Sequence, residues 1–326
     1  MSERSERTVD TAHGGAERRR GAVSGSGEPV TDWADEVSAD TAERIHGVLE
    51  RAAAADGVAA VSEQAVLSLT TPGPARHLVA ASDDEVVGYA NLVPAHGDHP
   101  AMAEAVVDPR HRGRGIGATL VSTALASGGA GARVWAHGNL APARAVAGRL
   151  GLAVARELWQ MRRPLATPEL PELRVPETVV LRTYAGPADD AELLRVNNAA
   201  FDWHPEQGGW TDGDIAVRRD SSWFDPKGLF IASDAADPGR MLGFHWTKVH
   251  TRDDPPAGEV YVVAVDPAAQ GRGLGRLLTL AGLHHLRDRG LGEVLLYTEA
   301  DNTAAVHTYA RLGFETAHVD AAYSAP

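Results

Sequence analysis

The pattern of apolar and polar residues predicts strands and helices in alternation along most of the chain. In the second half, short blocks rich in valine, leucine and aromatic residues are typical of strands, and longer stretches with apolar residues every three or four positions are typical of helices. The predicted elements are, in order, a strand over 178–185, a helix over 187–201, strands over 228–234, 240–250 and 258–265, a helix from Gly273, a strand over 293–299, a helix over 302–313 and a strand over 315–323. This order indicates an α/β fold.

The first half of the chain repeats this order. Its predicted elements are strands within 75–93 and over 101–107, a helix from Gly115, a strand over 132–138, a helix from Ala141 and a strand over 157–164. The two halves also share a motif, because AVVDPRHRGRGIG in the first half matches VAVDPAAQGRGLG in the second, with Gly115 opposite Gly273. We therefore expect two copies of one structural unit.

The same pattern sets the predicted boundaries of the units. Residues 1–30 are polar and charged without an apolar period, which predicts a disordered tail. The first unit is expected over 31–165 and the second over 179–326. The stretch between them, 166–178, is rich in proline and favours a semi-rigid extended linker.

Composition narrows the classes of function. The net charge of −13 opposes binding to a nucleic-acid backbone, and no apolar run approaches the roughly 20 residues of a membrane-spanning helix. We expect a cytoplasmic protein, a monomer, whose partners are small molecules rather than nucleic acid or membrane. The absence of cysteine excludes disulfides, thiolate metal sites and a cysteinyl intermediate in any acyl transfer.

The repeated glycine turn is a candidate anion site. In each unit the glycines fall where a strand leads into a helix, so the free backbone N–H groups of the first helical turn face whatever lies before it. Arg272 and Arg276 in the second copy, and Arg112 and Arg114 in the first, can add positive charge from the side.

Two common phosphate motifs do not fit this turn. No lysine follows the glycines as a Walker loop requires, and the spacing GxGxG differs from the GxGxxG of dinucleotide folds. What remains is Gln/Arg-x-x-Gly-x-Gly after a strand, represented by Gln270, Gly273 and Gly275 in the second half.

This motif resembles the pyrophosphate-binding turn of the Gcn5-related N-acetyltransferases. Over nearly the whole chain beyond the tail, the sequence is similar to the tandem mycothiol synthase family of that superfamily, through strings such as HPEQGGW, FHWTKVH and TEADNTAAVHTYARLGF. The resemblance implies two domains, each with a mixed central sheet flanked by helices. It also implies transfer of an acetyl group from acetyl-CoA to the cysteinyl amine of desacetylmycothiol, which gives mycothiol and CoA.

The resemblance also implies which residues bind the two substrates. For acetyl-CoA in the second domain these are Val263, Ala264, Val265, Gln270, Gly271, Arg272, Gly273, Leu274, Gly275, Arg276, Asn302, Thr303, Ala304, Ala305, Val306 and His307. In the first domain they are Ala105, Val106, Val107, Gly113, Arg114, Gly115, Ile116, Gly117 and Ala118. For the acceptor they are Glu63, Glu206, Lys248, Glu259 and Tyr297.

Acetyl transfer to an amine needs a base for the ammonium proton and an acid for the leaving thiolate. Glu259 begins the strand that leads into the second glycine turn and is the candidate base. Tyr309 is placed seven residues beyond Asn302, so that both fall on one helix face, and is the candidate acid. A solvated carboxylate and a core aromatic are the alternative interpretations of Glu259 and Tyr309.

The first unit lacks both groups. Allowing for a four-residue insertion in the second copy, Glu259 corresponds to Ala101, Tyr309 to Ala147 and Asn302 to Leu140. We therefore expect catalysis in the second domain, with the first holding acetyl-CoA without reacting. Histidines lack a metal-binding spacing, so no metal is expected. Another small amine as acceptor, or a non-catalytic acetyl-CoA sensor, remains an alternative function.

Overall fold

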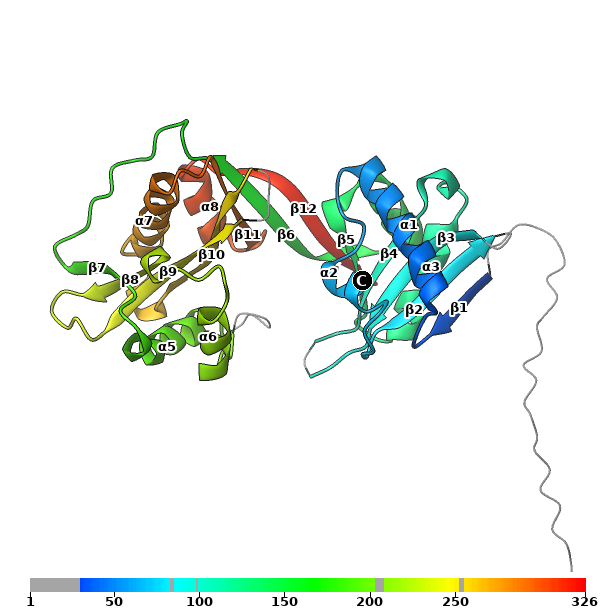
Figure 1. Cartoon of the computed structure of the whole chain (residues 1–326), viewed down its shortest axis with the longest axis horizontal. Helices are drawn as coiled ribbons and strands as arrows, with labels where there is room; N and C mark the ends of the chain where they lie inside the picture. Colours follow the sequence, from blue (N-terminus) through cyan, green and yellow to red (C-terminus); the bar gives the residue numbers. More distant parts are fainter. Residues whose placement is uncertain (1–29, 83–84, 98, 203–207, 252–254) are drawn as a thin grey trace, which may run out of the picture.

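The computed structural model describes residues 30–82, 85–97, 99–202, 208–251 and 255–326. Figure 1 shows two lobes joined by a pair of long strands. All strands belong to a 12-stranded mixed sheet in the order β1-β2-β3-β4-β5-β12-β6-β11-β10-β9-β8-β7. The predicted α/β class, with a mixed sheet and flanking helices in each half, is confirmed. The tail predicted over 1–30 lies almost wholly outside the described residues.

The first lobe contains the elements up to β6. They are β1 (Val30–Ala34), α1 (Ala39–Asp56), α2 (Glu63–Leu67), β2 (Arg76–Ser82), β3 (Glu85–Val93), β4 (Met102–Val107), the 3-10 turn η1 (Pro109–His111), α3 (Ile116–Gly128), β5 (Arg133–Ala136), η2 (His137–Asn139), α4 (Ala141–Leu150) and β6 (Ala153–Pro164).

The second lobe repeats the plan. Its elements are β7 (Val179–Thr183), η3 (Pro187–Asp189), α5 (Asp190–Ala200), α6 (Asp212–Arg219), η4 (Pro226–Gly228), β8 (Leu229–Asp234), β9 (Met241–His250), β10 (Ala257–Val265), η5 (Pro267–Ala269), α7 (Leu274–Asp288), β11 (Glu293–Glu299), α8 (Thr303–Arg311) and β12 (Glu315–Ser324).

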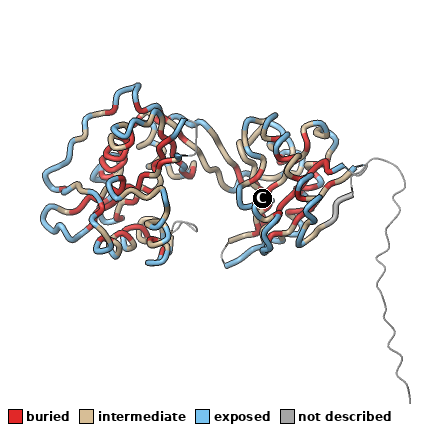
Figure 2. The backbone as a smooth tube through the Cα atoms, viewed as in Figure 1, coloured by how far each residue is buried: buried red, intermediate tan, exposed pale blue. Residues whose placement is uncertain are grey.

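Helices cover both faces of the sheet in each lobe. The buried residues gather in the interior of each lobe (Figure 2). In the second lobe, α5 and α6 pack on one face through Leu193, Ile215 and Trp246. Helix α7 packs on the other face through Leu278 and Leu283. The part of the sheet in each lobe is therefore covered on both faces, and a ligand must enter where strands separate or at a sheet edge.

Helices α1, α2 and α6 were not among the predicted elements. The signal for α1 is nevertheless present in the sequence. Ser38 caps its first turn, Gly57 ends it in a left-handed conformation (φ 72°), and the buried residues Ile45, Val48 and Ala52 recur at helical spacing. In both lobes a first strand is therefore followed by helices and then by a run of strands.

Strands β6 and β12 link the two lobes. β6 pairs with β11 of the second lobe from Leu158 to Pro164, whereas β12 ends beside β5 of the first lobe, with Ala321 opposite Ala136. The two strands also pair with each other along most of their length. The last strand of each repeat thus completes part of the sheet of the other repeat, which binds the lobes into one sheet.

The proline-rich segment 165–178 contains no helix or strand and runs along the second lobe. Leu170 is buried in the core of that lobe, and His284 Nε2 on α7 lies 2.9 Å from the Pro171 carbonyl. The segment is therefore anchored to the second lobe by apolar and polar contacts.

Candidate active site

Parallel strands separate close to the same place in both lobes. Pairing of β4 with β5 runs from Met102 to Glu104, and pairing of β10 with β11 runs from Gly258 to Val260. Beyond these points β4 and β10 continue toward the glycine turns while their parallel partners diverge. Backbone groups on the open side of each strand are free to bind an extended ligand, as a third strand would.

The two glycine turns have the same backbone conformation. Gly113 and Gly115 have φ of 78° and 89°, and Gly271 and Gly273 have φ of 77° and 76°, in the left-handed region that favours glycine. Gly115 and Gly273 precede α3 and α7 without a side-chain cap, so the first N–H groups of both helices point outward unpaired by a capping side chain. Each turn is thus suited to binding an anion.

The first lobe has an open cavity of about 480 Å³ that begins at its glycine turn. The lining includes the predicted residues Ala105, Val106, Val107, Gly113, Gly115, Ile116, Gly117 and Ala118. Arg114 is not part of the lining. Tyr323, at the end of β12, closes one side of the cavity and donates a hydrogen bond of 2.7 Å to Asn139 Oδ1.

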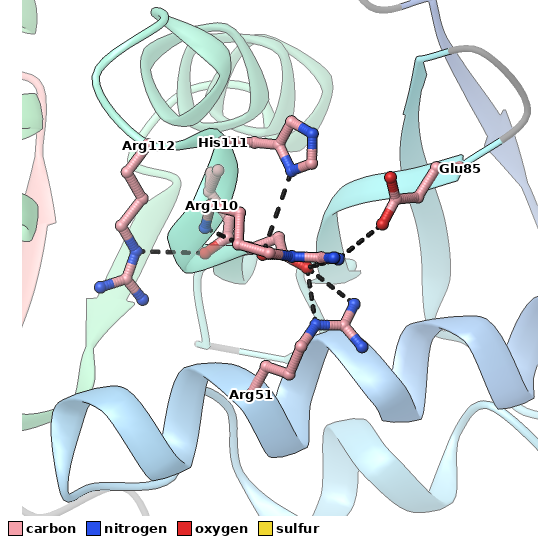
Figure 3. Close-up of polar contacts among 7 residues, drawn as sticks. Arg51, Glu85, Arg110, His111 and Arg112 are labelled. Atoms are coloured by element: carbon pink, nitrogen blue, oxygen red, sulfur yellow. Dashed lines mark hydrogen bonds and ion pairs between the residues drawn. The ribbon is translucent and has the colours of Figure 1, made fainter.

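Arg112 has a different role from the predicted one. Both of its terminal nitrogens lie 2.7 Å from the Asp56 carboxylate at the end of α1, so its charge is used to hold the turn against that helix. The neighbouring Arg51 and Arg110 converge on the same region (Figure 3), where they bind the buried Asp108. Hydrogen bonds from Arg110 hold the pKa of Asp108 well below its usual range.

Asp266 holds the equivalent place in the second lobe. It accepts hydrogen bonds from the Ala268 amide (2.9 Å) and from Arg195 of α5 (2.7 Å). In both lobes, a buried aspartate at the strand end therefore fixes the glycine turn to the first helix of that lobe. The sequence predicted the repeat of this aspartate and not its arginine partners.

The glycine turn of the second lobe opens into a cavity of about 390 Å³. Of the predicted residues, Arg272, Gly273 and Arg276 line it; Glu172 and Arg174 of the connecting segment lie opposite. The other predicted residues of this lobe lie on β10, in the turn and at the starts of α7 and α8, outside that cavity. Asn302 is the N-cap of α8, where its side chain accepts a hydrogen bond from the Ala305 amide, so it precedes the helix that carries Tyr309.

Glu259 is a buried carboxylate where β10 and β11 begin to separate. Its side chain is 10% exposed and is bounded by two basic groups of β9. His250 Nε2 lies 2.7 Å from Glu259 Oε2, and Lys248 Nζ lies 3.8 Å from the same oxygen. A solvated carboxylate at a strand entrance would not be so enclosed, and the arrangement favours a carboxylate held in one position.

Lys248 lies over two aromatic rings on the same face of the sheet. Its Nζ is 5.3 Å from the Trp223 ring centre and 5.4 Å from that of Tyr261, within the range of cation–π attraction. Tyr261 in turn accepts a hydrogen bond of 3.0 Å from Arg218. The face covered by α5 and α6 thus presents a carboxylate, an ammonium and aromatic rings, which suits a polar, hydroxylated acceptor.

Tyr309 lies on the other face of the same sheet. It packs against a cluster that includes Val260 and Phe314, with the Phe314 ring 5.7 Å away edge-on. Burial raises the pKa of Tyr309 to about 12, so the phenol carries its proton at neutral pH. Glu259 and Tyr309 therefore occupy opposite faces, on either side of the point where β10 leaves β11.

The remaining predicted acceptor residues are spread over both lobes. Tyr297 on β11 is 48% exposed, and its hydroxyl accepts a hydrogen bond from Gln160 of β6. Glu63 begins α2 in the first lobe and is exposed. Glu206 lies within 203–207, outside the described residues. The structure therefore brings Lys248 and Glu259 together and leaves Glu63 on a different lobe.

A β-bulge changes the comparison of the two repeats. In the second lobe Tyr261 has no partner in the ladder of β9 and β10, whereas the ladder of β3 and β4 is regular. Counting pairs back from the strand ends, Glu259 opposite Lys248 corresponds to Met102 opposite Val93. Met102 and not Ala101 is therefore the structural counterpart of Glu259, and it too cannot accept a proton.

The first lobe carries a polar cluster where its own strands separate. Glu104 accepts hydrogen bonds from the Ser62 amide (2.5 Å) and hydroxyl (2.7 Å), and His137 Nε2 lies 3.3 Å away. Burial would raise the pKa of Glu104, but the bonds from His137 and Ser62 outweigh it and lower that pKa. The carboxylate is thus held as an anion by Ser62 and His137.

Comparison with known proteins shows the same two units. The model of the acetyltransferase (GNAT) family matches residues 49–152 and again 197–314, which together cover more than half of the chain. The chain belongs to the acetyltransferase (GNAT) family. Its two glycine turns and two places of strand separation are thus two copies of a GNAT core.

Curated relatives match the GNAT chain over nearly its whole length. A protein of Nocardia farcinica named mycothiol acetyltransferase is 73% identical over 92% of this chain and 99% of its own. Proteins of the same name from Rhodococcus jostii and Mycolicibacterium smegmatis are 62% and 57% identical over 90% of this chain, and 98% and 99% of theirs.

Solved structures share the tandem fold. A GCN5-related N-acetyltransferase from Sphaerobacter thermophilus has a TM-score of 0.66 at 23% identity, covering 90% of this chain and 94% of that one. A tandem GNAT protein from the clavulanic acid biosynthesis pathway has a TM-score of 0.61 at 20% identity, covering 90% and 98%. These likenesses confirm the predicted fold of two GNAT domains.

In the described parts of the chain, no group of three or more histidine, aspartate or glutamate side chains is placed to hold a metal ion. Among the same residues, no helix combines the length and the apolar character needed to cross a membrane.

Proposed function

We propose that this GNAT chain transfers the acetyl group of acetyl-CoA to the cysteinyl amine of desacetylmycothiol, giving mycothiol and CoA. The observation that carries the proposal is the near full-length identity, up to 73%, with proteins named mycothiol acetyltransferase. The enclosed Glu259 beside Lys248 and the aromatic rings supports an amine acceptor with many hydroxyl groups.

The second lobe carries the chemistry in this proposal. The diphosphate of acetyl-CoA binds at the amides before α7, with Arg272 and Arg276 beside it, and the pantetheine arm follows the open edge of Val263 to Val265. Glu259 takes the ammonium proton, and the free amine attacks the thioester carbonyl. Tyr309 then protonates the departing sulfur and recovers a proton from the nitrogen as the amide forms. No covalent acyl-enzyme is involved, in accord with the absence of cysteine.

The first lobe binds acetyl-CoA without transferring its acetyl group in this proposal. Met102 and Ala147 stand at the positions of the base and the acid, and Glu104 is engaged by Ser62 and His137. The proposal also divides the chain into an N-terminal domain over 31–165 and a catalytic domain over 179–326. It further includes a monomeric state and a cytoplasmic location.

Release of CoA from acetyl-CoA tests the proposed function. Purified protein is incubated with acetyl-CoA and a panel that contains desacetylmycothiol, a polyamine, an aminoglycoside and a peptide with a free N-terminus, and the free thiol is followed. We expect turnover with desacetylmycothiol. Turnover only with another amine would overturn the acceptor, and CoA binding without turnover on any amine would indicate a sensor.

A further inference from the structure

His250 connects the buried carboxylate of Glu259 with solvent. The two side chains meet at 2.7 Å, and the exposed fraction rises from 10% for Glu259 to 29% for His250. His250 ends β9 and lies diagonally across from Glu259, because the ladder sets Ala257 opposite His250 and Lys248 opposite Glu259. Diagonal neighbours on adjacent strands are close enough for long side chains to touch.

Acetylation of an ammonium group releases a proton that must leave the site. The amine loses two protons on its way from ammonium to amide, and one of them ends on the CoA sulfur. The other remains on the base, so the carboxyl of Glu259 must lose it before the next turnover. With little solvent contact of its own, Glu259 needs a neighbour that can carry the proton outward.

The structure offers few groups for that step. Among the described residues, Lys248 and His250 are the polar neighbours in contact with the Glu259 carboxylate. Lys248 lies over two aromatic rings, and a lysine ammonium carries donors without a lone pair to accept a proton. An imidazole can accept a proton on one nitrogen and release one from the other near neutral pH.

We propose that His250 is the proton relay that returns Glu259 to its basic form after each transfer, an inference that rests on the proposed function. The O–H bond at Glu259 Oε2 breaks as an N–H bond forms at His250 Nε2. The resulting imidazolium then gives the proton on Nδ1 to water, which leaves the hydrogen on Nε2. Return of that hydrogen to Nδ1 through solvent frees Nε2 for the next turnover. His250 acts through Glu259 and does not touch the acetyl group, so it is a positioning and relay residue rather than a catalytic one.

Two variants distinguish a proton relay at His250 from a role in which His250 only holds the Glu259 carboxylate in place. His250→Gln keeps an N–H donor that can reach Glu259 and removes the imidazole that accepts the proton. His250→Ala leaves a partly exposed gap that free imidazole can enter. We expect kcat with desacetylmycothiol to fall about 10-fold or more in both variants, with KM for acetyl-CoA little changed. Added imidazole is expected to raise kcat of His250→Ala several-fold and to leave His250→Gln unaffected.

His46→Ala is the matched control, because His46 lies on α1 of the first lobe, away from the second-lobe site. Imidazole should not change its rate. A His250→Gln enzyme with wild-type kcat and pH profile, or a slow His250→Ala enzyme that imidazole does not rescue, would overturn the relay. Either result leaves the proposed function intact, since that fails only if the wild-type protein does not acetylate desacetylmycothiol.

Discussion

Asp320 and His137 belong to opposite repeats, yet Asp320 Oδ2 lies 3.7 Å from His137 Nδ1. The contact exists because β12, the last strand of the second repeat, ends in the sheet of the first. Asp320 also accepts a hydrogen bond of 2.7 Å from the Gly138 amide. The end of β12 is therefore held in the first lobe by the Asp320 carboxylate as well as by strand pairing.

The contact of His137 with Asp320 and Glu104 should stabilise the protein less as the pH becomes alkaline. Burial would lower the pKa of His137, but the hydrogen bonds and charges of Asp320 and Glu104 outweigh it and raise that pKa to about 9. The stabilisation is then fully present below about pH 6.5 and is lost as pH rises toward 9. We expect a loss on the order of 3 kcal/mol over that interval.

Urea unfolding at several pH values between 6.5 and 9.5 measures this loss. His137→Gln keeps a donor toward Glu104 but cannot titrate, so its stability should be lower at pH 6.5 and should change less with pH. Parallel curves for the wild-type protein and His137→Gln would show that His137 is not held as a cation.

His245 should produce the opposite pH dependence. It is fully buried on β9, and its Nδ1 lies 2.8 Å from the Leu278 carbonyl, which can only accept, so Nδ1 carries the hydrogen. Burial lowers the pKa of His245 to about 4. The stabilisation is present above about pH 6.5 and is lost as pH falls toward 4, with a loss on the order of 3 kcal/mol.

Unfolding of the wild-type protein between pH 7 and 4.5 is compared with that of His245→Asn. Asparagine can keep the donor to Leu278 but cannot take up a proton, so its free energy of unfolding should fall less steeply on acidification. If the free energy of unfolding falls equally steeply with pH in both proteins, groups other than His245 cause the loss of stability in acid.

Gly282 on α7 is required by the close approach of β9. A Cβ added there would lie 2.1 Å from His245 Cε1 and 2.9 Å from a Thr247 methyl group. Gly282→Ala should therefore destabilise the protein by about 3 kcal/mol or more, through forced displacement of a buried ring. Gly148→Ala on α4 is the control, because a Cβ there meets nothing within 4 Å and helix propensity favours alanine by up to about 1 kcal/mol. Thermal unfolding distinguishes the two; equal melting temperatures would contradict the packing argument.

The sequence predicted the features that depend on local pattern. The order of most strands and helices, the repeated glycine turn and the absence of a base at the position of Glu259 in the first lobe follow from periodicity and spacing. The partners of β6 and β12 could not be predicted, because an amphipathic strand does not specify which edge it joins. The contact of His250 with Glu259 was not predicted either, because it depends on the register of two strands. The bulge at Tyr261, which the sequence did not reveal, shifts the counterpart of Glu259 in the first lobe by one residue.

Removal of the Glu259 carboxylate should separate chemistry from cofactor binding. Glu259→Ala is expected to lower kcat by about 100-fold or more, as general bases commonly contribute. The glycine turn is distant from this side chain along β10, so acetyl-CoA affinity measured by calorimetry should stay nearly unchanged. A Glu259→Ala enzyme with wild-type turnover would remove Glu259 from the role of base.

The two glycine turns should respond differently to the same substitution. Gly115 and Gly273 have φ of 89° and 76°, so a valine at either position is strained and its side chain would stand in front of the helix amides. Calorimetric titration of the wild-type protein with acetyl-CoA should find two sites. Gly273→Val should retain one site and lose turnover, because only the second lobe has Glu259 and Tyr309. Gly115→Val should also retain one site but keep most of its turnover, and an equal catalytic loss in both variants would mean that the first site takes part in the reaction.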